Sequence, residues 1–354
     1  MSTTTTDPVD TTPTRAADHA PSPSVQMVGM LAGFQISQAL YVVAKLDIAT
    51  ALRDRPRPVP ELAEALGVRP QPLGRLLRTL TGLGLFTRHA TGDYAVTPLG
   101  ATLAAGTTGS MRNLALTWME THYAPFGLLA DTVRTAEPAA TRYYGRPFFD
   151  WLAGDPHQVE QFTDAMGDLT GGIKTAAVAG YHLPAGRTVA DIGGADGTLL
   201  LALLEADPDP DRRGIVFDLD HVVPAAGACI ADHPLRERVE AVGGDFLRAV
   251  PSADVYLLSM ILHDWDDASC ATILRRIAAA ARPGARMVCL EFVVPPGDTP
   301  HMSTMIDLTM LGMLTGRERT AEEFDTLITG AGMRLDRIEP TPGPLSIIEA
   351  TVLG

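Results

Sequence analysis

The sequence is poor in cysteine and in positive charge, and each shortage excludes a class of protein. Its three cysteines, Cys229, Cys270 and Cys289, lack the spacing of a zinc site or of a disulfide framework. This usage indicates a reduced, intracellular setting. Lysine and arginine number 28 against 42 acidic residues, which gives a formal net charge of −14. Such a chain disfavours nucleic acid or an anionic membrane as its main partner, because phosphate binding needs a basic surface.

Long apolar runs are also scarce. We find no run of the roughly 18 residues that a membrane span needs. Residues 1–22 are rich in Thr, Pro and Asp and lack the apolar segment of a signal peptide. We therefore expect a disordered tail over residues 1–22 and a cytoplasmic protein without a membrane partner.

Two patterns predict a helical N-terminal domain over residues 23–110. From Val25 to Leu52 apolar residues recur at three- and four-residue steps, which predicts a helix. Its wide apolar stripe fits either a core helix or a dimer interface. Residues 59–105 then predict two helices and a hairpin that turns at Gly92-Asp93, the order of a winged helix. A regulator would read DNA with the second helix, but Arg75 and Arg78 are its only cations, which favours a packing role.

The rest of the chain divides at about residue 184. Residues 111–183 predict a helical linker and substrate lid, interrupted by the turn-rich "YGRPFFDWLAGDP". From Thr188 strand-like and helical stretches alternate, which predicts a doubly wound, Rossmann-like α/β sheet over residues 184–354. The end, "RLDRIEPTPGPLSIIEATVL", has no helix between its two strands. It therefore predicts a hairpin whose last strand is antiparallel to the sheet.

A glycine loop follows the first strand of the predicted sheet. In "VADIGGADGT", Gly193, Gly194 and Gly197 allow close approach of a ligand to the backbone, beside the N-terminus of the next helix. The loop lacks the second glycine of the dinucleotide fingerprint. Asp191 and Asp196 would repel a pyrophosphate but could pair with an ammonium or sulfonium group. This favours S-adenosylmethionine over a nicotinamide dinucleotide.

Acidic residues end the first three strands. Asp218, at the end of the second strand, could accept hydrogen bonds from both ribose hydroxyls. After the third strand, Asp245 could meet an adenine amino group, and Phe246 could cover the ring. A simple turn at Gly-Gly-Asp is the alternative explanation of the third. Together with Asp191 the three acids indicate a ligand at the carboxyl edge of the sheet.

At this point the chain resembles a known family. "DIGGADGT", "GIVFDLDHVV", "VGGDF", "LHDWDD" and "GRERTAEEFDTLITGAGM" look like the S-adenosylmethionine-dependent O-methyltransferases of plant caffeate-type and actinobacterial natural-product pathways. The resemblance covers residues 25–354. It implies a homodimer with interlocking N-terminal helices. It also implies a cofactor site lined by Gly193, Gly194, Asp191, Asp218, Asp245, Phe246 and Ser259, with Phe148 and Trp151 near the methionine end. Plant members carry a lysine at the position of Ser259.

The stretch "YLLSMILHDWDD" places a histidine and several acids at the end of a buried strand. His263 could be a capping or core histidine bonded to Asp264. However, Glu291 interrupts an apolar strand, where a carboxylate needs a partner, and Glu318 precedes a helix. The resemblance implies that His263 is the catalytic base and that Glu291 and Glu318 flank it. A neutral imidazole can take the proton of a phenol as its oxygen attacks, at a site where no metal is implied.

The expected acceptor is a hydroxylated aromatic or polyketide-type molecule in an apolar pocket. In the family, the methionine-rich helix in "HMSTMIDLTMLGML" closes over the acceptor. Two alternatives to methyl transfer stay open. They are a ligand-sensing winged-helix regulator and a relative that uses the cofactor for other chemistry. The candidate pocket residues are Trp118, His122, Met166, Asp264, Met302, Met305 and Met313.

Overall fold

The computed structural model describes residues 22–353, apart from the side chains at positions 170 and 171. Most of the predicted tail, residues 1–21, lies outside this range. Ser22 is the N-cap of the first helix, and its hydroxyl accepts a hydrogen bond from the N–H of Val25. The described chain therefore begins at a helix start with an ordinary capping residue.

The predicted helix between Val25 and Leu52 is divided into three. These are α1 (Pro23–Leu31), α2 (Gly33–Lys45) and α3 (Ile48–Ala51), and Asp47 between the last two has a left-handed backbone. Pro23–Lys45 is long and apolar enough to cross a membrane, with a mean hydropathy of 1.5. The expectation that no segment would reach this length is therefore wrong. Core helices and signal sequences pass the same test, so composition alone does not put this segment in a bilayer.

The winged-helix prediction is confirmed in its elements. Helices α4 (Val59–Leu66) and α5 (Pro70–Gly82) precede an antiparallel hairpin of β1 (Phe86–Arg88) and β2 (Tyr94–Val96), and α6 (Pro98–Ala101) follows. Leu62, Leu77 and Phe86 are buried in one core that joins the helices to the hairpin. This packing accounts for the apolar positions of the unit.

Residues 112–177 are helical, as predicted. The segments are α7 (Arg112–Thr117), η1 (Trp118–His122), η2 (Pro125–Leu128), α8 (Leu129–Thr135), α9 (Ala139–Tyr144), α10 (Phe148–Leu152), α11 (Pro156–Leu169), η3 (Thr170–Lys174) and α12 (Thr175–Ala177). Both η1 and η3 are π-helical turns, a rare form that often occurs at functional sites.

The predicted α/β sheet is present and has seven strands. They are β3 (Thr188–Ile192), β4 (Arg213–Asp218), β5 (Val239–Gly243), β6 (Val255–Ser259), β7 (Arg286–Glu291), β10 (Met333–Pro340) and β11 (Ser346–Val352). Their spatial order is β10-β11-β7-β6-β3-β4-β5. Strands β3 to β7 are parallel, and β11 is antiparallel to both β7 and β10. The order reverses between β3 and β6, and ligands of such sheets bind at this switch point.

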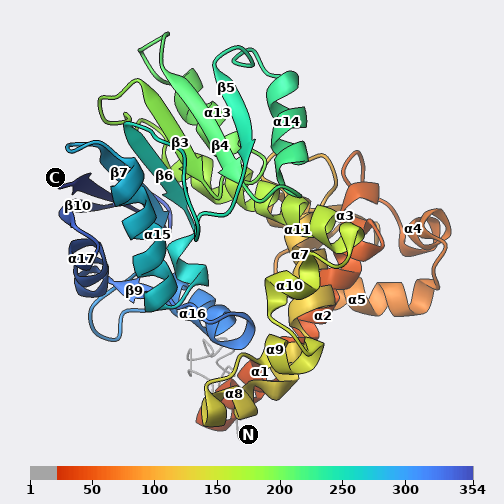
Figure 1. The fold of residues 1–354 in the computed structure, drawn as a ribbon. Coiled ribbons are helices and arrows are strands. Elements are labelled where there is room, and N and C mark those ends of the chain that lie inside the picture. Colours follow the sequence, from red (N-terminus) through yellow and green to blue (C-terminus); the bar gives the residue numbers. More distant parts are fainter. Residues whose placement is uncertain (1–21, 354) are drawn as a thin grey trace, which may run out of the picture.

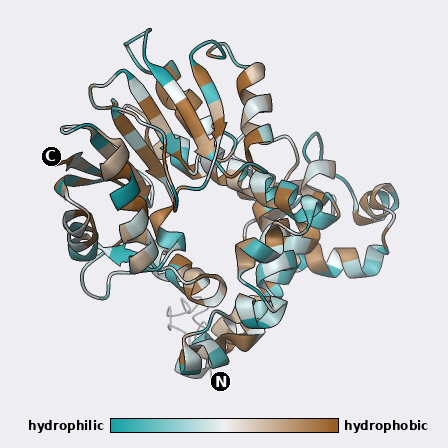
Figure 2. Cartoon of the chain, in the orientation of Figure 1, coloured by the Kyte–Doolittle hydropathy of each residue, from teal (hydrophilic) through white to brown (hydrophobic). Residues whose placement is uncertain are grey.

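Helices cover both faces of the sheet (Figure 1). One core contains side chains of α15 (Asp267–Ala280) and α17 (Ala321–Gly330); the other contains those of α13 (Thr198–Glu205) and α14 (Val223–Ala231). Figure 2 shows that the central strands and α13 are mainly hydrophobic, as expected of a sheet buried on both sides.

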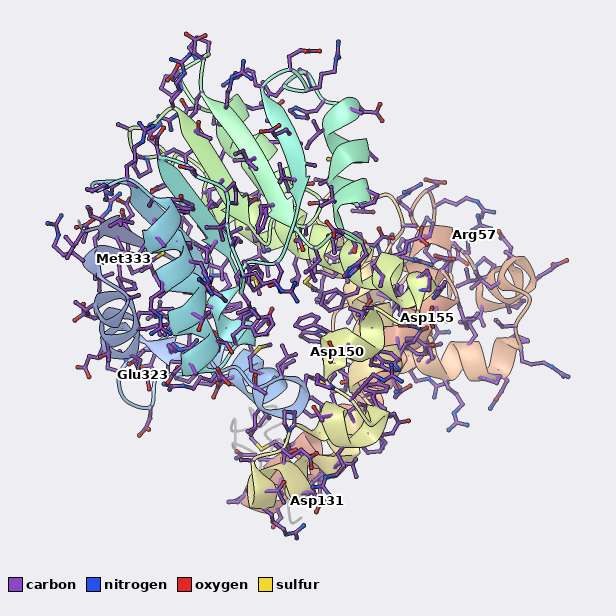
Figure 3. The ribbon with its side chains drawn as sticks, in the orientation of Figure 1. Arg57, Asp131, Asp150, Asp155, Glu323 and Met333 are labelled. Atoms are coloured by element: carbon purple, nitrogen blue, oxygen red, sulfur yellow. The ribbon has the colours of Figure 1, made fainter. Side chains whose placement is uncertain are left out.

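The helical N-terminal half and the sheet half meet along the carboxyl edge of the sheet. Helix α16 (Met302–Met313) contacts α8 and α9, and Phe149 stacks on Trp265 with 6.5 Å between ring centroids. Figure 3 marks both halves, with Asp150 and Asp155 in the helical half and Glu323 and Met333 in the sheet half. Side chains from both halves therefore border the region beyond the strand ends.

Candidate active site

The active-site segment begins where β6 ends. Met260, directly after the strand, has a left-handed backbone with φ of 57°, a conformation uncommon for a residue with a side chain. This turn directs the N–H groups of Ile261 and Leu262 toward Glu291, whose Oε1 accepts both at 3.0 and 2.8 Å. Strained backbone of this kind is often retained at functional sites. Here it leads into the short helix η4 (Leu262–Asp264), which carries His263.

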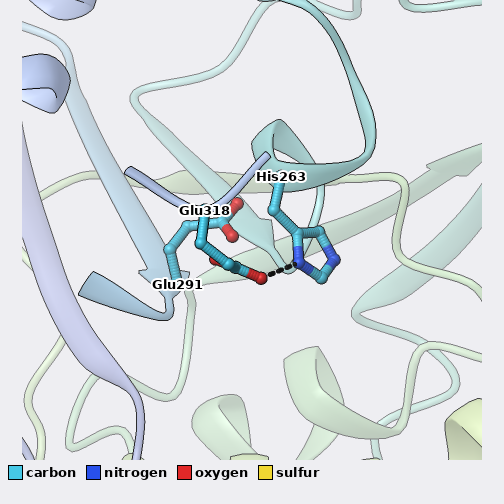
Figure 4. Close-up of side chains that lie close together, drawn as sticks. All are labelled: His263, Glu291 and Glu318. Carbon is cyan, nitrogen blue, oxygen red and sulfur yellow. Dashed lines mark hydrogen bonds and ion pairs between the residues drawn. The ribbon is translucent and has the colours of Figure 1, made fainter. Parts of the chain in front are cut away.

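His263 lies between two carboxylates. Its Nδ1 is 2.8 Å from Oε1 of Glu318, and its Nε2 is 3.4 Å from Oδ1 of Asp264. Figure 4 shows Glu291 on the same side of the ring as Glu318. His263, Glu291 and Glu318 are respectively 5%, 0% and 4% exposed. The structure therefore brings together the three residues that the resemblance assigned to catalysis.

Burial lowers the pKa of His263, but its acidic neighbours outweigh this effect. The charge of Asp264, the hydrogen bond to Glu318 and the charge of Glu291 raise that pKa to about 9. Burial in turn raises the pKa of Glu291 and of Glu318, although the charge on His263 opposes it. The ring is therefore strongly basic, which suits the removal of a proton from a phenol.

Two residues that sequence reasoning missed hold this segment in position. Arg319 is 1% exposed and donates to the carbonyl oxygens of Leu262 and Trp265 at 2.8 and 2.9 Å. A Cβ atom on Gly316 would overlap the backbone of His263 and Asp264, so only glycine fits there. Both lie close to Glu318 in "GRERT". This stretch is charged and contains a glycine, so its sequence gives no indication that Arg319 is buried.

His263, Glu291 and Glu318 could also be grouped as metal ligands, since one atom from each lies within 4.8 Å of the others. The sequence implies no metal at this site, and that expectation stays a prediction. Residues separated widely in sequence form such a group only in the fold. In the described residues, the Oε2 atoms of Glu291 and Glu318 are buried without a hydrogen-bond partner.

The glycine loop after β3 is built for close approach. A Cβ on Gly193 would overlap Ile261, and one on Gly194 would lie 2.9 Å from Val216 and from the Asp191 carboxylate. Asp191 is 1% exposed, and its Oδ1 has no hydrogen-bond partner among the described residues. Burial raises its pKa to about 7, an effect that the charge of Lys174 opposes. A buried, unpaired carboxylate oxygen beside a glycine loop fits a cationic ligand.

Asp218 and Asp245 stand at the ends of β4 and β5, as predicted. The carboxylate of Asp218 accepts from the N–H groups of Ala195 and Leu219 at 2.9 and 2.7 Å. That of Asp245 accepts from the N–H of Leu247 at 2.8 Å. These bonds orient both carboxylates, and each carboxylate oxygen retains a further acceptor site.

Ser259 and Phe246 border the same edge of the sheet. The hydroxyl of Ser259 is buried and has no hydrogen-bond partner within the described part of the chain. It lines a small pocket with Asp191, Gly193 and Gly194. Phe246 packs edge-on against Trp265, with 5.7 Å between ring centroids.

Phe148 and Trp151 lie in an aromatic cluster rather than against the glycine loop. The Phe148 ring is 5.4 Å from that of His122, and His122 is 6.2 Å from Trp118. Burial lowers the pKa of His122 to about 3, so its imidazole is neutral at pH 7. Trp151 contacts the rings of Tyr144 and Phe148. The predicted contact of Phe148 and Trp151 with the cofactor stays a prediction.

The candidate methionines separate into two groups. Met166 lines the glycine-loop pocket, and Met313 is 1% exposed in the core cluster that contains Phe148. Met302 and Met305, near the start of α16, are 47% and 67% exposed. Contact of all four with an acceptor stays a prediction.

Comparison with known proteins identifies the family. An O-methyltransferase domain matches residues 126–334, and an O-methyltransferase dimerisation domain matches residues 28–106. This chain belongs to the O-methyltransferase family. It is 39% identical to phenazine O-methyltransferase PhzM of Lysobacter antibioticus, over 92% of this chain and 95% of that protein. It is 34% identical to 3-amino-4-hydroxybenzoate 4-O-methyltransferase of Streptomyces cremeus, over 92% and 90%.

Solved structures agree with this assignment. The O-methyltransferase NcsB1 from neocarzinostatin biosynthesis was crystallised with S-adenosylmethionine and 2-hydroxy-5-methyl naphthoic acid. It superposes with a TM-score of 0.77 at 34% identity, over 95% of this chain and 100% of that one. The protein is thus an S-adenosylmethionine-dependent methyltransferase with a Rossmann-like sheet, and its dimerisation domain indicates a homodimer.

Proposed function

We propose that this enzyme methylates a hydroxyl group of an aromatic or polyketide-type molecule in secondary metabolism, with His263 as the general base. The names of its relatives specify a phenazine, a hydroxybenzoate and a hydroxynaphthoate as their ligands or substrate classes. All are flat rings. The observation that best supports this role of His263 is its position between Glu318 and Asp264, beside the switch point of the sheet.

The residues at the glycine loop fit S-adenosylmethionine. Gly193 and Gly194 let the loop pack closely against Ile261, Val216 and Asp191, where a side chain would clash. The unpaired Oδ1 of Asp191 and hydroxyl of Ser259 need polar partners. We assign Asp218 to the ribose hydroxyls, Asp245 and Phe246 to adenine, and Phe148 and Trp151 to the region of the methionine end. When bound, the cofactor supplies a methyl group activated by its sulfonium charge.

His263 removes the acceptor proton through Nε2, because Nδ1 is held by Glu318. Glu318 fixes the ring orientation, and Glu291 stabilises the imidazolium while anchoring the turn after β6. Asp264 adjoins Nε2 and contributes to the basicity of the ring. General-base help of this kind is worth about 10² to 10⁴ in rate.

The acceptor pocket in this proposal has an aromatic wall and a methionine-rich wall. The aromatic wall contains Trp118 and neutral His122, and Phe148 packs edge-on against His122. Met166, Met302, Met305 and Met313 form the other wall, where thioethers adapt to flat rings of varied shape. Asp264 faces the acceptor hydroxyl. These assignments predict that the acceptor is a largely apolar molecule with one oxygen that is buried on binding.

We further propose that α1 and α2 carry the dimer contact and that the enzyme is cytoplasmic. Apolar side chains of these helices are largely exposed in a single chain, among them Met30 at 75% and Leu31 at 69%. A second copy would cover such a surface.

Methylation of a panel of ligands tests the proposal. Purified enzyme is incubated with isotope-labelled S-adenosylmethionine and hydroxyphenazines, hydroxybenzoates and hydroxynaphthoates, each paired with its amino analogue. Mass spectrometry of products should detect labelled methyl ethers from at least one hydroxyl compound. Methylation of the amino analogues alone would overturn the proposed O-methylation.

A further inference from the structure

Lysine is almost absent from this chain, and one of its two lysines lies at the cofactor site. Among 28 cationic residues only Lys45 and Lys174 are lysines. Lys45, on α2, is exposed and forms an ion pair with Glu120 at 2.7 Å. Lys174 is the last residue of η3 and is half-buried. Its position therefore differs from that of a solvated surface cation.

The ammonium group of Lys174 reaches the end of β6. Its Nζ lies 3.5 Å from the carbonyl oxygen of Ser259, and its side chain lines the small pocket that Asp191 and Asp196 also line. Burial lowers its pKa, while the charges of Asp191, Glu291, Asp196 and Asp264 oppose that effect. An ammonium group has three N–H donors, and the weak contact with Ser259 accounts for one.

Two other buried polar groups in this pocket lack a hydrogen-bond partner among the described residues. The Oδ1 of Asp191 and the hydroxyl of Ser259 have no hydrogen bond within residues 22–353, and the two residues are 1% and 7% exposed. Unpaired buried polar atoms are rare in native proteins and often mark a ligand site. The pocket therefore combines a cation, an anion and a hydroxyl within one small space.

We propose that Lys174 binds the carboxylate of the amino-acid end of S-adenosylmethionine, opposite Asp191, which takes its ammonium group. This inference rests on the proposed cofactor site at the glycine loop. An amino acid is a zwitterion, and a pocket lined only by Asp191 and Asp196 would repel its carboxylate. Lys174 reverses that repulsion. The enzyme consequently discriminates in favour of cofactor forms that retain the carboxylate.

Binding measurements with truncated ligands test this role. S-adenosylhomocysteine has the amino-acid end, and 5′-deoxy-5′-methylthioadenosine lacks it. By isothermal titration calorimetry, Lys174→Met should weaken S-adenosylhomocysteine at least about tenfold and change methylthioadenosine by less than about twofold. Lys174→Arg should retain most of the affinity, because it keeps the charge. The matched control, Lys45→Met, should leave both affinities unchanged.

The outcomes separate this inference from the proposed function. Equal weakening of the two ligands by Lys174→Met would overturn it, since the loss would then concern the shared adenosine or the fold. Unchanged binding of S-adenosylhomocysteine would overturn it as well, while the cofactor site would stand. Wild-type protein that binds neither ligand would overturn both.

Lysine acylation gives a readout independent of substitution. With two lysines in the chain, peptide mass spectrometry can follow Lys174 with Lys45 as the internal reference. S-adenosylhomocysteine should slow acylation of Lys174 severalfold, and methylthioadenosine should not. Equal protection by both ligands would contradict a contact with the carboxylate.

Discussion

The Nδ1 atom of His263 lies 2.8 Å from Oε1 of Glu318, and both side chains are buried. This contact leaves Nε2 as the nitrogen able to meet an acceptor, with the carboxylate of Asp264 3.4 Å away. An imidazole between two acids holds its proton firmly. The enzyme must therefore work through a base that is strong but largely protonated at neutral pH.

Replacement of His263 by alanine should slow the chemical step without affecting the cofactor. The expected loss is at least about tenfold in the single-turnover rate, because general-base help accounts for about 10² to 10⁴. Affinity for S-adenosylhomocysteine should stay within about twofold of wild type. His89→Ala, at the exposed hairpin turn, is the control. A single-turnover rate equal to wild type would remove His263 from the role of base.

The pH dependence of methyl transfer should report the pKa of His263. Since the neutral ring is the base and its pKa is raised to about 9, the single-turnover rate should rise from pH 6 to about 9. Asp264→Asn removes a charge that raises this pKa, so the rising limb should move to lower pH. Glu322→Gln, an exposed acid on α17, should leave the limb in place. An unmoved limb in Asp264→Asn would mean that another group titrates.

Arg319 should act as a positioning residue for the His263 segment. Arg319→Met leaves the carbonyl oxygens of Leu262 and Trp265 with only weaker donors such as the Cys270 thiol, and it removes the ion pair with Asp267. This loss should lower the free energy of unfolding by about 2 to 4 kcal/mol in urea titrations. Methyl transfer should slow while affinity for S-adenosylhomocysteine is retained. Arg317→Met, which removes half-exposed ion pairs with Glu323 and Asp267, should cost less than about 1 kcal/mol. An equal loss of unfolding free energy in the two variants would contradict the proposed positioning role of Arg319.

The sheet was predictable because its strands are nearly continuous apolar runs with acids at their ends. Asp191, Asp218 and Asp245 meet at one edge, as parallel strands require. The grouping of His263 with Glu291 and Glu318 came from the family resemblance. No local pattern connects residues so far apart in the chain.

Other features depend on tertiary packing and leave no periodic trace. The break between α1 and α2 falls within a continuous apolar stripe. The left-handed backbone of Met260 is uncommon for a residue with a side chain, so the residue type does not predict it. In the sequence Lys174 and Arg319 look like ordinary surface cations, but the fold half-buries Lys174 and buries Arg319. Phe148 was assigned by resemblance near the cofactor, and that contact stays a prediction. Its described ring contacts include His122, Tyr144 and Trp151.

Charge on the exposed face of α1 should break the proposed dimer. Met30 is 75% exposed, and Met30→Glu would place a carboxylate in an apolar interface, where burial of an unpaired charge is costly. Sedimentation velocity should detect dimers for wild type and a shift toward monomers for the variant. Val133→Glu, an equally exposed apolar position on α8, is the control. A fully dimeric Met30→Glu protein would locate the interface elsewhere.

Asp191, in the glycine loop, should lower the stability of the folded protein while it contributes to binding of the cofactor. Burial raises the pKa of Asp191 to about 7, so its folded-state pKa exceeds the ordinary value near 3.9. The folded protein therefore holds this proton more tightly than the unfolded chain, and stability falls as the pH rises from about 4 to 7. At pH 8 the ionised group costs up to about 4 kcal/mol. Asp191→Asn should thus raise the melting temperature at pH 8, and the gain should shrink as the pH is lowered toward 5.

The same substitution should weaken S-adenosylhomocysteine, because the ligand's ammonium group loses its carboxylate partner. Asp232→Asn, at an exposed helix end, should change neither property. A melting temperature for Asp191→Asn below that of wild type at pH 8 would mean that the carboxylate is already neutralised within the protein, with Lys174 as the nearest source of that charge. Stability gained together with binding lost is the expected result for a buried acid that is retained for its ligand.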